Sequence, residues 1–160
     1  MQRKLATLLL AGTMAVPTFA QDMPSPGMWK VEGKTTGVDL ASPSGVPAAM
    51  TDMIRNRIMS RPAQDHSQCV TAEDFASAPE RLVKSSESRC EYERFDLSGG
   101  RIDAVAACDF PQGGSGRMEM SGSYSTDRYE ATSVLTVQAG PLGAMTITTE
   151  TTGTRVGPCS

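Results

Sequence analysis

The sequence predicts a mainly β fold with one helix: an antiparallel meander that forms a curved sheet or incomplete barrel of six to seven strands, packed on one amphipathic helix and held by two disulfides. Three observations lead to this prediction. Apolar and polar residues alternate along most segments, as they do in strands with one buried face. A single segment, residues 47–59, has the spacing of a helix. Finally, two of the four cysteines lie at mirror positions about a Ser-Gly-Gly turn.

The first 20 residues have the features of a secretory signal peptide. Arg3 and Lys4 supply positive charge, an apolar run of about a dozen residues follows, and the small residues "TFA" end at a cleavage site after Ala20. Residues 21–160 then form a single domain in the periplasm or outside the cell, where cysteines usually form disulfides. No later stretch approaches the roughly 20 apolar residues of a membrane-spanning helix, so we expect no transmembrane segment in the mature chain.

The first strand and the helix come before the first cysteine. In residues 27–38, Trp29 and Val31 alternate with polar residues, which is typical of a half-buried strand. In residues 47–59, apolar residues recur three and four positions apart, and Pro47 suits the start of a helix. We expect this helix to cover the apolar face of the sheet.

A short strand carries Cys69, and "TAED" follows it. Thr71 and Asp74 are three residues apart, as in a capping box, so they predict a single helical turn.

The spacing of the cysteines predicts their pairing. With a turn at residues 98–100, antiparallel pairing places Cys90 opposite Cys108, at a separation close to that of a disulfide. Elimination then pairs Cys69 with Cys159. A two-residue Gly99-Gly100 turn would instead shift the register by one residue and put the two sulfurs on opposite faces.

The second half of the chain predicts three further strands, at residues 117–125, 128–138 and 144–156, separated by a Thr-Asp turn and by "AGPLG". Each strand alternates apolar residues with Glu, Ser or Thr, so the sheet has one apolar face. On that face we expect Met118, Met120, Tyr124, Tyr129, Ala131, Leu135, Val137, Met145 and Ile147.

The order of several short pieces resembles a known family. These pieces are "PGMW" before the first strand, "CVTAED" at Cys69, the cysteine-closed hairpin and the terminal "TGTRVGPC". From Pro26 to Cys159, the chain resembles the exported bacterial domain of unknown function (DUF) family 3617. The resemblance implies an exported or periplasmic single domain of Gram-negative bacteria with no assigned activity.

Composition and motifs argue against several functions. Loss of the signal peptide would take the net charge from −3 to −5 (13 basic against 18 acidic side chains), and the basic residues are scattered, so we exclude nucleic acid as a partner. The single histidine, His66, lies in a polar stretch, where we expect it to be exposed. No zinc motif, catalytic triad or cofactor motif surrounds it. We therefore expect no catalytic residue, no metal site and no cofactor, and we expect a protein that is not an enzyme.

These exclusions favour a non-catalytic binding module for an apolar small molecule or for another envelope protein. Methionine side chains suit adaptable apolar surfaces, and five of them fall on faces predicted to point inward. The candidate ligand-binding residues are Trp29, Met50, Met53, Met118, Met120 and Met145. Ordinary core packing is the alternative for these residues. A second hypothesis is periplasmic copper handling, because thioethers are soft ligands for Cu(I).

Overall fold

The chain folds into one curled antiparallel sheet. The computed structural model describes residues 23–41, 46–83, 90–110, 114–138 and 143–159, so the predicted signal peptide lies outside the described residues. The strands are β1 (Gly27–Leu40), β2 (Gln64–Val70), β3 (Cys90–Ser98), β4 (Arg101–Asp109), β5 (Ser115–Tyr124), β6 (Arg128–Gln138) and β7 (Ala144–Gly157). The helices are α1 (Ala48–Met59), α2 (Ala72–Ser77) and the short 3-10 helix η1 (Pro79–Leu82).

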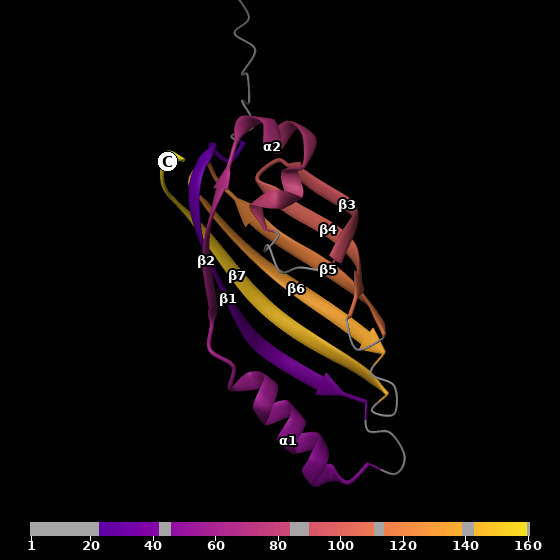
Figure 1. Cartoon of the computed structure of the whole chain (residues 1–160). Coiled ribbons are helices and arrows are strands. Elements are labelled where there is room, and N and C mark those ends of the chain that lie inside the picture. The colour runs from indigo at the N-terminus through magenta and orange to yellow at the C-terminus, as the bar shows by residue number, and fades with distance from the viewer. Residues whose placement is uncertain (1–22, 42–45, 84–89, 111–113, 139–142, 160) are drawn as a thin grey trace, which may run out of the picture.

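The seven strands lie in the order β2-β1-β7-β6-β5-β4-β3, and the sheet curls into a half-barrel with β2 and β3 at its open edges (Figure 1). Strands β3 to β7 form the predicted meander, since each pairs with the next along the chain. The first strand then joins the last, with Val31 opposite Gly153. The fold class is therefore confirmed: a seven-stranded antiparallel half-barrel with one main helix packed on it and two disulfides.

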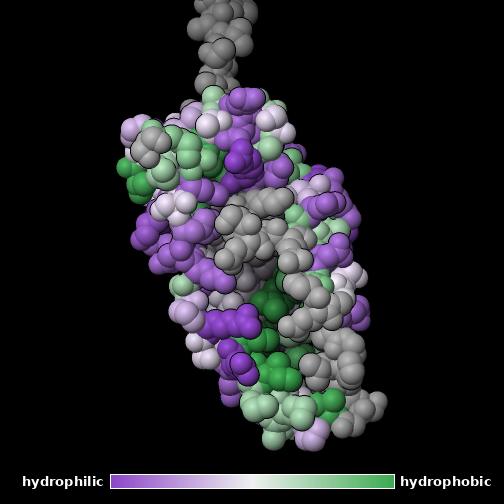
Figure 2. Space-filling view, in the orientation of Figure 1, coloured by the Kyte–Doolittle hydropathy of each residue, from purple (hydrophilic) through white to green (hydrophobic). Residues whose placement is uncertain are grey.

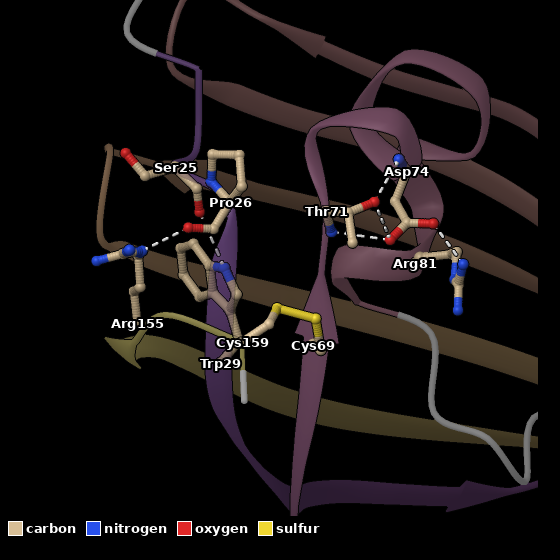
Figure 3. Close-up of a disulfide and its surroundings, with 9 residues drawn as sticks. All are labelled: Ser25, Pro26, Trp29, Cys69, Thr71, Asp74, Arg81, Arg155 and Cys159. Carbon is tan, nitrogen blue, oxygen red and sulfur yellow. Dashed lines mark hydrogen bonds and ion pairs between the residues drawn. A yellow bond between two sulfur atoms is a disulfide. The ribbon is translucent and has the colours of Figure 1, made fainter.

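Both predicted disulfides are present. Cys69 on β2 is bonded to Cys159, which follows β7, and their Cα atoms are 5.5 Å apart. Figure 3 shows this bond beside Trp29, whose indole N–H donates to the carbonyl oxygen of Ser25 at 3.2 Å. The bond ties the edge strand β2 to the end of the chain across β1, so β2 is held by more than its hydrogen bonds to β1.

The second disulfide, Cys90–Cys108, forms by a different route from the one predicted. The turn has two residues, Gly99 and Gly100, with φ of 57° and 74°, and Ser98 pairs with Arg101. Two consecutive positive φ values define the tight turn that suits the twist of a hairpin, and glycine adopts them freely. The predicted Ser-Gly-Gly turn is therefore wrong.

A β-bulge at Glu93 restores the cysteine register. Phe95 pairs with Ala104 and Tyr92 with Ala106, so β3 has one residue more than β4 between these pairs. The extra residue moves β3 back by one position and places Cys90 opposite Cys108, with 4.0 Å between their Cα atoms. The bulge also keeps Tyr92 and Phe95 on the same, inner face.

The core lies at one end of the half-barrel. Trp29 and Tyr129 are fully buried there, with ring centroids 5.8 Å apart. The helices α2 and η1, which follow β2, lie over this end (Figure 1), and Leu82 of η1 is 0% exposed within the core. The predicted capping box is confirmed, since Thr71 and Asp74 exchange both hydrogen bonds at the start of α2.

The main helix α1 packs at the other end of the sheet, against β1 (Figure 1). Thr51 is its buried residue, and the Arg55 side chain donates to the carbonyl oxygen of Val38 at 3.2 Å. We expected this helix to cover the apolar face, but the core is covered by α2 and η1. The expectation that Met50 and Met53 point inward is also wrong, because they are 46% and 62% exposed.

Candidate functional site

A groove of about 360 Å³ lies on the concave side of the sheet, between the core and the end of α1. Figure 2 shows hydrophobic side chains, in green, gathered in this hollow above α1. Because α2 and η1 cover the core end of the half-barrel and α1 lies at the opposite end, the described helices leave this stretch of the inner face uncovered. The groove is therefore the candidate functional site.

The floor of the groove consists of cross-strand rows with different chemistry. One row is apolar: Met118 on β5 pairs with Leu135 on β6, which pairs with Ile147 on β7. The next row toward the core places Met120 beside two hydroxyl side chains, Ser133 and Thr149. Both rows line the groove. Since Met118, Leu135 and Ile147 are only partly buried, the floor offers an apolar surface next to hydroxyl groups.

The walls carry the titratable groups. Tyr92 of β3 lines one side, and its burial, with a smaller contribution from Glu80, raises its pKa to about 12. The phenol is therefore protonated at neutral pH. On the other side, Gln64 and His66 of β2 and Arg61, which follows α1, complete the wall with Ile58 of the helix.

His66 differs from its predicted exposed position. It pairs with Val31 of β1 and lines the groove, and its ring atom Nε2 is buried without a hydrogen-bond partner among the described residues. The polar residues around His66 form strand β2, in which His66, Gln68 and Val70 alternate with exposed residues. The imidazole therefore lies on the same face of the strand as the buried Val70.

The structure separates the predicted ligand-binding residues. Met118 and Met120 line the groove. Trp29 is fully buried in the core, as expected for ordinary core packing, and Met145 is partly buried at the beginning of β7 without lining the groove. The remaining two, Met50 and Met53, lie exposed on α1. The thioethers that the copper hypothesis requires therefore lie in different surroundings: Met118 and Met120 line the groove, whereas Met50 and Met53 are exposed on α1.

Several groove residues were not identified as candidates from the sequence. Leu135 and Ile147 were placed on the inner face of their strands but not recognised as part of a site. Arg61 and Ile58 enter the groove because α1 ends beside it. The sequence holds no signal for this contact, since it depends on where the helix packs.

The fold and the site together define a class of protein: a curled, disulfide-bonded β domain with an open concave groove. The family model described as "Protein of unknown function (DUF3617)" matches residues 24–159. The chain belongs to this family, as its motifs suggested. No curated protein and no solved structure matches the chain significantly.

Two features are absent from the described residues. Within those ranges, no helix has both the length and the apolar character needed to span a membrane. The same part of the chain has no group of three or more His, Cys, Asp or Glu side chains arranged to hold a metal ion.

Proposed function

We propose that the protein binds a small amphipathic molecule with a single apolar chain in the concave groove, and that it does so without catalysis. The observation that carries this proposal is the row of Met118, Leu135 and Ile147, which stays partly exposed in a defined hollow. The volume of about 360 Å³ lies within the roughly 300–1,000 Å³ of small-molecule sites. Hydroxyl groups beside the apolar row suit a ligand with both polar and apolar parts.

The test is a titration of the delipidated protein with N-phenyl-1-naphthylamine, a neutral apolar dye that fluoresces when it leaves water. We expect saturable binding at one site. Leu135→Asn should weaken binding about tenfold, because it removes apolar contact area and adds an amide to the floor. The matched control is Val134→Asn, on the neighbouring residue of β6, whose side chain is outside the groove and 37% exposed.

Two results would count against the groove. One is the absence of saturable dye binding by the folded protein. The other is equal weakening by both substitutions, which would place the dye elsewhere. Circular dichroism and thermal unfolding of both variants keep a folding defect apart from a binding defect. If the protein retains an envelope protein and not a lipid-like molecule during purification, the groove serves a protein partner instead.

We propose in addition that the chain is exported to the periplasm after cleavage near Ala20. The charged start and apolar run of the first 20 residues support this proposal. The two disulfides are consistent with an oxidising compartment. Expression of the full chain, cell fractionation and intact-mass measurement test it. The expected product is periplasmic, begins at Gln21 and carries four oxidised cysteines; a cytoplasmic product of full length contradicts the proposal.

A further inference from the structure

The charge of the groove lining differs from that of the whole chain. The full sequence has 18 acidic and 15 basic side chains. Among the groove-lining residues that the structure describes, Arg61 is the one side chain with a formal charge, and no Asp or Glu is present. A lining without acid in a mildly acidic protein indicates that the site accommodates negative charge.

Arg61 is available for such a charge. Its guanidinium group makes no hydrogen bond or ion pair with any described residue, whereas Arg55, on the preceding helix, is paired with Asp52 at 2.7 Å. The backbone at Arg61 is fixed, because its N–H donates to the carbonyl oxygen of Ile58 at 3.2 Å and Pro62 follows. The side chain therefore starts from a defined place at the mouth of the groove.

A second polar group on the same wall also lacks a protein partner. His66 has a buried Nε2 atom with no hydrogen bond to the described part of the chain. Buried polar atoms are rarely left unpaired in folded proteins, because each one costs the solvation it has lost. A ligand with polar groups near Arg61 and near His66 would give both side chains a partner.

Building on the proposed function, we infer that the ligand is an anionic amphiphile. Its carboxylate or phosphate head is held by Arg61, whose planar guanidinium can donate two parallel hydrogen bonds to either group. Its apolar chain lies on Met118, Leu135 and Ile147. The hydroxyl row of Ser133 and Thr149 lies beside this apolar row and lines the same groove.

Isothermal titration calorimetry with three matched ligands tests this inference: dodecanoate, dodecyl phosphate and dodecanol. We expect at least one of the two anions to bind the wild type about tenfold more tightly than dodecanol, as a charge-assisted hydrogen bond would give. The ranking of carboxylate and phosphate distinguishes a free fatty acid from a phosphate-headed lipid as the natural source.

The decisive variant is Arg61→Gln, which should lower the affinity for the preferred anion to the level of dodecanol and leave dodecanol binding unchanged. The control is Arg57→Gln, which removes an exposed arginine of α1 that does not line the groove. We expect it to leave all three affinities unchanged.

The outcomes separate this inference from the proposed function. If dodecanol binds the wild type as tightly as the anions, or if Arg61→Gln leaves the preference intact, the assignment of an anionic ligand is overturned while the groove remains a binding site. If none of the three ligands binds and the dye does not bind, the groove itself is not the site and both proposals fall.

Discussion

Position 153 is glycine because the ring of Tyr129 occupies the space beside its Cα atom. The two residues are directly opposite each other on β6 and β7, and a Cβ atom at this position would overlap the ring. The close approach lets the Tyr129 ring pack against β7 at Gly153 and contact Trp29 in the core. The absence of a side chain at position 153 thus allows the contact between Tyr129 and Trp29.

Gly153→Ala should therefore destabilise the protein by about 1–3 kcal/mol, the usual cost of overpacking a core. Urea unfolding followed by tryptophan fluorescence measures the change. The matched control is Gly33→Ala on β1, where the nearest atoms to an added Cβ are 3.8 Å away. That substitution should be neutral or stabilising by up to about 1 kcal/mol, because alanine restricts the unfolded chain. Equal effects at the two positions would contradict this account of Gly153.

Asp74 links the stability of the α2 segment to pH. Its carboxylate accepts hydrogen bonds from the backbone N–H of Thr71 at 2.8 Å and from the Thr71 hydroxyl at 2.9 Å, and it also pairs with Arg81 (Figure 3). The backbone hydrogen bond from Thr71 is the main cause that lowers the pKa of Asp74 below its usual value, and Arg81 adds to it. A carboxyl group whose folded pKa is lowered stabilises the fold above its unfolded pKa, and this stabilisation is lost as the pH falls through the folded pKa.

We expect Asp74→Asn to lower the melting temperature at pH 7, and we expect the gap from the wild type to narrow as the pH falls from about 5 toward about 2. Thermal unfolding in that pH series is the measurement. Glu73→Gln is the control, because Glu73 is the neighbouring acid in the same turn and is exposed. A gap for Asp74→Asn that stays constant with pH would show that hydrogen-bond geometry, and not ionisation, is responsible.

At the scale of elements, the hairpin β3–β4 shows how a turn and a bulge act together. The Gly-Gly turn alone would place Cys90 and Cys108 on opposite faces, and the extra residue at Glu93 corrects this by one position. Removal of Glu93 leaves a regular hairpin with the same inward residues. Removal of Glu91 makes Cys90 and Tyr92 adjacent, so they cannot both point to the inner face. One of the two side chains must then point outward.

The deletion of Glu93 should therefore keep the Cys90–Cys108 disulfide and nearly all the stability, apart from the exposed ion pair of Glu93 with Arg117. The deletion of Glu91 should either leave free thiols or lower the melting temperature by exposing Tyr92. Thiol counting in denaturant, together with thermal unfolding of both proteins, gives the answer. Intact disulfide and unchanged stability in both proteins would show that the bulge can move freely along β3.

The sequence predicted those elements whose signal is local and periodic. Strand β6 agrees with its predicted bounds of 128–138, because apolar and polar residues alternate along most of it, with a break at Ser133 and Val134, and a turn signal lies on each side. The bulge did leave a signal, since Tyr92 and Phe95 share a face although they are three residues apart, and regular strands require even spacing. That spacing was not recognised.

Other features of the fold have no local signal. Leu82, which fills the core, lies in a 3-10 helix of four residues, too short to show a period. Strand β1 pairs with β7, which is far from it in the sequence. The pattern of apolar and polar residues within a strand does not indicate which other strand it pairs with. The sequence therefore predicted two groove residues, Met118 and Met120, from the alternation within one strand. It did not predict the groove wall formed by α1 and β2, because that wall depends on how distant segments pack.

At the scale of the molecule, the two disulfides close loops of very different length. Cys69 and Cys159 are 90 residues apart in sequence, whereas Cys90 and Cys108 are 18 apart. A longer closed loop restricts the unfolded chain more, and loop entropy gives about 4.6 kcal/mol for the first bond and about 3 kcal/mol for the second. The long-range bond also holds the edge strand β2 in place.

Replacement of both Cys69 and Cys159 by serine should therefore destabilise the protein more than replacement of Cys90 and Cys108, by about 1–2 kcal/mol. Urea unfolding of the two double variants, without reductant, measures the difference. A larger destabilisation on replacement of Cys90 and Cys108 would indicate that the hairpin disulfide also stabilises the native packing of β3, beyond its effect on the unfolded chain.

With the export proposed above, the pairing of β1 with β7 also sets the order in which the protein can be assembled as the chain is synthesised. β1 emerges about 100 residues before β7, which at about 5–20 residues per second is roughly 5–20 s. During this interval β1 lacks its main neighbour, and the thiol of Cys69 meets Cys90 and Cys108 before Cys159 exists. The β3–β4 hairpin can form the Cys90–Cys108 disulfide locally in that time. Cys69 then has no other free thiol to react with until Cys159 is synthesised.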